Sequence, residues 1–165
     1  MPVQHIPKKP PTGLARIIWR LPIWLFRLRI NWILGSRFLL LRHTGRVSGL
    51  PRANALEVVE YDRDTDTYYV VSAWGEQADW YKNVVAHPEV TVRVSRREFA
   101  ARARFVPPAE AEEIMARYAR ENPRLARNLP RVAGYRPDGT EAGYREIGRM
   151  IKFVGLRPSA PKGLE

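Results

Sequence analysis

Apolar and polar residues alternate with the two-residue period of a β-strand over much of the chain after residue 36. The clearest case is Glu98–Val106, where Phe99, Ala101 and Phe105 fall on one face and arginines on the other. Other short runs are rich in β-branched and aromatic residues and end at turn-forming residues. The pattern predicts strands at Arg37–Arg42, Ala53–Tyr61, Thr67–Ala73, Val90–Ser95, Glu98–Val106 and Met150–Leu156.

Helical segments are predicted between and after these strands. Asp79 can cap a short helix, and Pro107-Pro108 opens a longer one. The predicted helices span Trp80–Ala86, Ala109–Glu121, Arg124–Val132 and Glu141–Arg149, and Pro130 is expected to interrupt the third. Because successive strands are antiparallel, the pattern indicates an α+β fold, mainly antiparallel, with a barrel or curled sheet of about six strands and peripheral helices.

The N-terminal segment has a different pattern. Residues 1–11 are proline-rich and read as a flexible tail, and residues 12–35 predict an amphipathic helix rich in tryptophan and arginine that Pro22 kinks or divides. Arginines interrupt its apolar stretch too often for a membrane span, and it lacks the cleavage pattern of a signal peptide. The chain is therefore divided into an N-terminal appendage (1–35), a barrel domain (36–158) and a loose tail (159–165).

The charge is concentrated in that N-terminal third. The chain has a net charge of +11, and residues 1–56 hold ten Lys and Arg and no acid, which leaves 18 basic and 17 acidic residues in the remainder. A localised excess predicts one anionic partner. A tryptophan- and arginine-rich helix suits an anionic membrane surface, and the alternative is a helix packed on its own domain or on a second subunit. No nucleic-acid motif accompanies the charge, so nucleic acid is not expected as a partner.

Cysteine and histidine content excludes several kinds of chemistry. The chain has no cysteine, which rules out disulfides, thiolate catalysis and zinc–cysteine sites. Its three histidines, at positions 5, 43 and 87, are scattered and predict no metal site. No serine–histidine–acid arrangement can be argued from the sequence.

The segment Gly45–Arg52 is the strongest candidate site. It places two glycines, Ser48, Arg46 and Arg52 between two predicted strands. Glycines allow backbone N–H groups to converge, and arginines bind phosphate or carboxylate with a planar fork. The composition alone equally fits a solvated hairpin turn.

Two further segments could contact a flat ring. Ser72-Ala73-Trp74-Gly75 follows the third predicted strand, and Trp80 and Asn83 lie in the next helix. Trp80 and its neighbour Tyr81 could equally be core residues. In the C-terminal half, Tyr135 and Tyr144 could donate a proton at a reducing site.

These segments together resemble the deazaflavin-dependent nitroreductase family. The resemblance rests on the runs Leu41–Arg52, Val70–Gly75 and Asp79–Val90, and it covers about residues 37–106. It implies a split β-barrel that binds coenzyme F420, with FMN as the alternative, and that reduces quinones, nitroaromatics or related electrophiles near the membrane. It also implies a possible homodimer.

The resemblance implies a role for each of these segments. The phosphate and polyglutamate tail of F420 would be held by the loop, and the deazaflavin would be bordered by the strand end and supported by the helix. The implied cofactor-binding residues are Gly45, Arg46, Val47, Ser48, Gly49, Arg52, Ser72, Ala73, Trp74, Gly75, Trp80 and Asn83. Tyr135 and Tyr144 are the candidate catalytic residues.

Three positions depart from the family pattern. Val47 and Trp74 stand where relatives often carry lysine, and Glu57 stands where an aromatic residue is expected. An acid at position 57 either repels an anionic cofactor or is turned away from it. The sequence therefore predicts a cytoplasmic F420-dependent reductase, peripheral at the inner face of the membrane. The alternative is a non-catalytic protein of the same fold that binds a lipid, a fatty acid or a cofactor.

Overall fold

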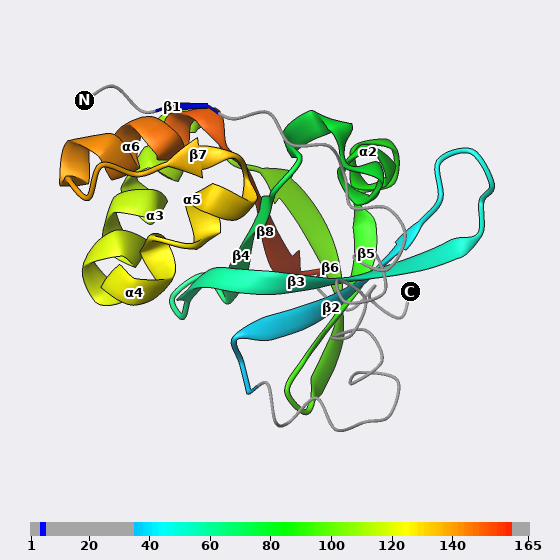
Figure 1. Ribbon diagram of the computed structural model, residues 1–165. Helices are drawn as coiled ribbons and strands as arrows, with labels where there is room; N and C mark the ends of the chain where they lie inside the picture. The colour runs from blue at the N-terminus through cyan, green and yellow to red at the C-terminus, as the bar shows by residue number, and fades with distance from the viewer. Residues whose placement is uncertain (1–3, 6–34, 160–165) are drawn as a thin grey trace.

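A computed structural model describes residues 4–5 and 35–159 (Figure 1). The predicted N-terminal helix and most of the tail lie outside the described residues. Gln4 and His5, which the sequence placed in a flexible tail, form a short strand β1 (Gln4–His5) paired with β7 (Tyr135–Arg136).

Six strands close into an antiparallel barrel, as the alternation predicted. The strands are β2 (Phe38–Thr44), β3 (Pro51–Asp62), β4 (Thr67–Ser72), β5 (Glu89–Val94), β6 (Arg97–Phe105) and β8 (Lys152–Pro158). Their order around the barrel is β2-β3-β4-β8-β6-β5, and β5 pairs with β2 to close it. The last strand therefore inserts between β4 and β6, which brings the end of the chain beside its middle. Closure leaves the six strands of the barrel, as the structure describes them, without a free edge.

In the part of the chain that the structure describes, four helices form a layer on one side of the barrel, and a fifth lies apart from them (Figure 1). A layer on one side contains α3 (Pro108–Glu121), α4 (Pro123–Ala126), α5 (Leu129–Val132) and α6 (Glu141–Met150). Helix α2 (Asp79–Ala86) lies apart from these four, and a 3₁₀ turn, η2 (Gly75–Gln77), precedes it. The predicted helix 124–132 is interrupted, as expected, but the break lies between Ala126 and Leu129, and Pro130 lies in the first turn of α5, where its missing N–H breaks no helical hydrogen bond.

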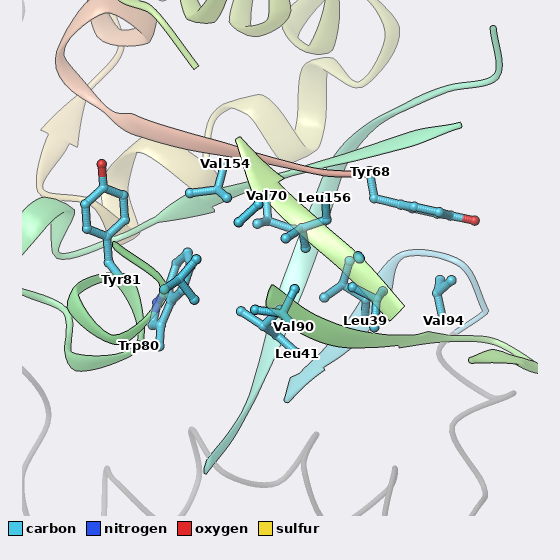
Figure 2. Close-up of a cluster of buried hydrophobic side chains, with 14 of the residues drawn as sticks. Leu39, Leu41, Tyr68, Val70, Trp80, Tyr81, Val90, Val94, Val154 and Leu156 are labelled. Atoms are coloured by element: carbon cyan, nitrogen blue, oxygen red, sulfur yellow. The ribbon is translucent and has the colours of Figure 1, made fainter. Parts of the chain in front are cut away.

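The barrel strands have two apolar faces, each with its own core. In β4 all six residues are buried, and alternate side chains point to opposite faces. Tyr68 and Val70 join the interior core, and Tyr69 and Val71 join the core under α3 and α6. The interior core takes buried residues from β2, β4, β5, β6 and β8. Figure 2 shows part of it, with Trp80 and Tyr81 of α2 at its edge.

Candidate functional site: an anion-binding loop anchored to helix α2

The loop between β2 and β3 is a closed turn. The Gly45 N–H donates to the carbonyl of Leu50 at 2.9 Å, and the Gly49 N–H donates to the carbonyl of Gly45 at 2.8 Å. Gly49 has a φ of +66°, which side-chain-bearing residues rarely adopt. A Cβ on Gly45 would lie 2.6 Å from Ser48 Oγ, which already accepts from the Leu50 N–H. Gly49 is therefore favoured by its backbone conformation, and a side chain at Gly45 would displace the Ser48 hydroxyl from the turn.

Helix α2 anchors this loop through Arg46. The Arg46 backbone N–H and its Nη1 both donate to Asn83 Oδ1, at 3.1 and 2.9 Å. Its Nη2 also donates to Asp79 Oδ1 at 3.1 Å. Asn83 is buried, so the two bonds it accepts hold the loop in one place.

Asp79 does not have the role that the sequence predicted. The structure places it as the first residue of α2, after an Ala78 cap, and its side chain makes no capping hydrogen bond. Instead its carboxylate forms an ion pair with Arg46, and it is 85% exposed. An ion pair this exposed contributes about 0–1 kcal/mol. The prediction was wrong because a helix cap depends on the backbone before the helix, and that backbone is set by η2.

His43 lies behind Asn83 and was not recognised from the sequence as part of the site. It is 5% exposed, with Nδ1 3.3 Å from Asn83 Nδ2 and Nε2 2.9 Å from Asn54 Oδ1. Burial lowers the pKa of His43, the bond to Asn54 opposes this effect, and the charge of Arg52 adds to it. The sequence did contain a signal for its burial, because His43 lies two residues after Leu41 and four after Leu39 and therefore shares their inward face of the strand.

Donors at the tip of the loop remain open. Within the described part of the chain, nothing accepts from the N–H groups of Val47 and Ser48, and the Arg52 side chain forms no hydrogen bond or ion pair. Arg52 is exposed, and Val47 is 91% exposed. Two open N–H groups and a free guanidinium can bind a phosphate or carboxylate.

The segment Ser72–Gly75 is a tight turn at the end of β4. Ser72 is 1% exposed, and its hydroxyl donates to the carbonyl of Gly75 at 2.7 Å. Gly75 has a φ of +54°. Ala73 is half-buried, and Trp74 is half-buried and packs against the interior core. The Ser72 hydroxyl therefore fixes the turn on which the predicted ring-binding residues sit.

The neighbouring aromatic residues of α2 are core residues. Trp80 and Tyr81 are 6% and 8% exposed, and the Tyr81 ring meets Phe105 edge-on at 5.3 Å between centroids. Trp80 also packs edge-on against Tyr81. A role for Trp80 in supporting the cofactor stays a prediction.

Lys152 belongs to this region, although the local sequence gave no signal for it. It is the first residue of β8 and pairs opposite Ser72. Its Nζ lies 3.0 Å from Glu76, which raises the pKa of Lys152. The positive charge acts on both Tyr81 and Tyr135, opposing the effect of burial on their pKa values.

The two candidate proton donors lie in different surroundings. Tyr135 is half-buried at the margin of the helical core, on the side reached by Lys152, and burial raises its pKa. Tyr144 is 6% exposed inside the helical core, and burial raises its pKa too. The structure thus brings Tyr135, but not Tyr144, into electrostatic contact with a residue beside Ser72.

Glu57 is turned away from the loop. It accepts from the Tyr118 hydroxyl at 3.2 Å and pairs with Arg37 at 3.3 Å. Burial, with the charge of Glu57, raises the pKa of Tyr118. Because Asn54 and Glu57 are three residues apart on one strand, their side chains point to opposite faces. Of the two alternatives for this acid, the structure supports the second, in which Glu57 is turned away from the loop and binds Tyr118 and Arg37.

Comparison with known proteins gives the family. The model of the family described as F420H(2)-dependent quinone reductase matches residues 29–131. The chain belongs to this family. An F420H(2)-dependent quinone reductase of Mycobacterium tuberculosis is 31% identical over 107 residues, which cover 57% of this chain and 70% of that protein. The protein is accordingly an F420-dependent reductase with coenzyme F420 as its cofactor, which decides against the non-catalytic alternative.

Solved structures show the same fold. An F420-H2 dependent reductase is similar with a TM-score of 0.51 at 23% identity, covering 74% of this chain and 96% of that one. A domain-swapped dimer is similar with a TM-score of 0.50 at 21% identity, covering 82% and 99%. They confirm the barrel predicted for the reductase.

The residues of the loop fit the anionic part of this cofactor. Phosphate and carboxylate oxygens accept hydrogen bonds, and the loop offers the N–H groups of Val47 and Ser48 and the guanidinium of Arg52, none of which has a partner among residues 4–5 and 35–159. The charge of Arg46 is shared with Asp79, so Arg52 is the less neutralised of the two arginines.

Among the described residues, no helix has the length and apolar character needed to cross a membrane.

Proposed function

We propose that this reductase transfers a hydride from reduced F420 to a quinone. The observation that carries the proposal is the loop of open anion donors on a barrel of this family. The named M. tuberculosis relative is a quinone reductase, which supports a quinone as substrate. Nitroaromatic compounds are a second class of electron-poor ring that the same chemistry would reduce.

The reduced deazaflavin supplies the hydride, and the chain binds and orients the reactants. Arg46, Arg52 and the N–H groups of Val47 and Ser48 would hold the phosphate and the acidic tail. The turn at Ser72–Gly75 would border the deazaflavin, and Trp80 and Asn83 would support it. Of the two candidate proton donors, Tyr135 is the one we favour, because the positive charge of Lys152 opposes the rise that burial gives its pKa.

Titration with F420 tests cofactor binding directly. The purified protein should quench or shift F420 fluorescence with saturation in the micromolar range. With F420 reduced, adding a soluble quinone should restore deazaflavin absorbance at a rate proportional to enzyme. No F420 binding at tens of micromolar would contradict the proposal. Binding of F420 without reduction of the quinone would show that quinones are not the substrate.

We further propose that the enzyme works at the inner face of the membrane through residues 12–35. The support is the acid-free, arginine- and tryptophan-rich sequence of that segment, together with the low solubility of long-chain quinones in water. Full-length protein should pellet with anionic vesicles but not with neutral ones, and a chain lacking residues 1–35 should remain in the supernatant. Pelleting by the truncated chain would show that the anchor lies elsewhere.

The similarity to a domain-swapped dimer also supports a homodimer for this enzyme. Light scattering on the eluting protein would measure its mass. A monomer at micromolar concentration would contradict this part of the proposal.

A further inference from the structure

A series of hydrogen bonds with a buried centre runs from β3 to the anion-binding loop. It links Asn54 to His43, His43 to Asn83, and Asn83 to Arg46, at 2.9, 3.3 and 2.9 Å. His43 and Asn83 are 5% and 6% exposed, so water cannot easily replace a missing partner. Asn54 lies two residues along β3 from Arg52, which pairs opposite His43, so the hydrogen bonds begin beside Arg52 and end at Arg46.

The donors and acceptors in this series can be arranged in only one way. Asn83 Oδ1 accepts from both the backbone and the side chain of Arg46, so its Nδ2 must face His43. His43 Nδ1 is then the acceptor, and its proton sits on Nε2, which donates to Asn54 Oδ1. Reversing the Asn83 amide would set its NH₂ against two donors of Arg46.

We propose that His43 is a positioning residue for the cofactor loop, and that its neutral Nε2–H form holds Asn83 in the orientation that anchors Arg46. The inference rests on the proposed binding of the F420 tail at this loop. His43 does not contact the cofactor. It acts through Asn83 and determines where Arg46 and the open N–H groups that follow it are held.

Protonation of His43 would undo this arrangement. A proton on Nδ1 would face the Asn83 NH₂, and the amide could satisfy it only by turning away from Arg46. The surrounding charges also oppose a second proton. Arg52 on β3 and Arg46 in the loop are positive, and on α2 exposed Asp79 is already paired with Arg46, with half-exposed Lys82 beside it. On β5 the ladder to β2 ends at the Arg42–Thr91 pair, two residues from Glu89, whose carboxylate is already paired with Arg102. Arg93 lies further along β5, opposite Leu40.

Three substitutions of His43 separate positioning from packing. In His43→Asn, the side-chain oxygen can occupy the place of Nδ1 and accept from Asn83. In His43→Gln, the amide can replace only the Nε2 donor to Asn54. In His43→Leu, the volume is retained and both bonds are lost. F420 affinity should follow the Asn83 bond, with the asparagine variant near wild type and the leucine and glutamine variants weaker by about tenfold.

Two readouts on the apoprotein do not depend on F420. Nitrogen NMR of wild-type His43 should report a proton on Nε2 and a free Nδ1. Hydrogen exchange at the Arg46 amide should be slow in the wild type and in His43→Asn, and at least tenfold faster in His43→Leu. An Nδ1–H tautomer, or unchanged Arg46 exchange in His43→Leu with a normal melting temperature, would overturn the proposal.

The pH profile of F420 binding completes the test. Wild-type affinity should fall as pH drops through the lowered pKa of His43, and His43→Asn should lack that step. The same step in the asparagine variant would assign it to another group and overturn the proposal. Failure of wild-type binding at every pH would instead refute the proposed function, and the apoprotein readouts would still decide the role of His43.

Discussion

Replacing Arg52 with alanine should weaken F420 binding without weakening the fold. In the described part of the chain the Arg52 side chain has no hydrogen-bond or ion-pair partner, so its removal leaves no buried group unsatisfied. Arg46 is a poorer choice, because its removal would also strip buried Asn83 Oδ1 of two donors.

The magnitude follows from the chemistry of the contact. A hydrogen bond from a guanidinium to an anion contributes about 1.5–3 kcal/mol net. Because Arg52 is exposed, water and salt reduce this toward the lower limit. At about 1.4 kcal/mol per factor of ten, the dissociation constant for F420 should rise about 10-fold to 30-fold in Arg52→Ala at low salt.

Fluorescence titration at two salt concentrations measures the effect. The matched control is Arg63→Ala, which removes the same charge from the turn at the other end of β3. Raising the salt should reduce the difference in F420 dissociation constant between Arg52→Ala and wild type. Arg63→Ala should bind F420 as the wild type does at both salt concentrations. Equal losses in the two variants would show that only overall charge matters, and an unchanged affinity would remove Arg52 from the site.

Three further outcomes are expected. Val47→Lys adds a charge at a 91% exposed loop position, so it should tighten F420 binding about threefold or more in titrations at low salt, and high salt should abolish the gain. Gly148→Ala should lower the free energy of unfolding by about 1–3 kcal/mol in urea melts, because a Cβ there would lie 2.7 Å from the carbonyl oxygen of Ala111; exposed Glu146→Ala is the control, and equal stability of the two would refute the close approach of α3 and α6. The pKa of Glu110 lies below its usual 4.5 because Arg104 donates to it, so its share of stability is present above that pH and lost as pH falls through the lowered value. In urea melts at falling pH, Glu110→Gln should lose less of its free energy of unfolding than the wild type, by less than about 1 kcal/mol. An equal loss in the two proteins would assign the acid sensitivity to other carboxylates.

Strand and helix positions could be predicted because they depend on local patterns. The two-residue alternation of Glu98–Val106 becomes β6, and Pro107 and Pro108 become the N-cap and the first residue of α3. Ends moved by one or two residues, since the last pair in a ladder is set by the partner strand. Pairing of Gln4–His5 with β7 was missed because neither segment has an alternating pattern of its own.

The candidate site was predicted in its parts and not in its connections. The glycines and arginines of the loop were identified from composition and resemblance, and the structure gives them a closed turn with open donors. Asp79 was misassigned, and Lys152 was missed, because their neighbours lie on other elements. The direction of Glu57 was left open until the structure showed its bonds to Tyr118 and Arg37.

The sequence alone determined that the chain alternates as an antiparallel sheet, concentrates its charge in one third and carries a glycine- and arginine-rich turn. These properties are local, because they depend on side-chain period, composition and backbone freedom. Only the tertiary structure decided that β8 lies between β4 and β6, that Lys152 faces Ser72, and that Asn83 joins His43 to Arg46. Those contacts depend on how the barrel closes, which depends on the register of all six strands together.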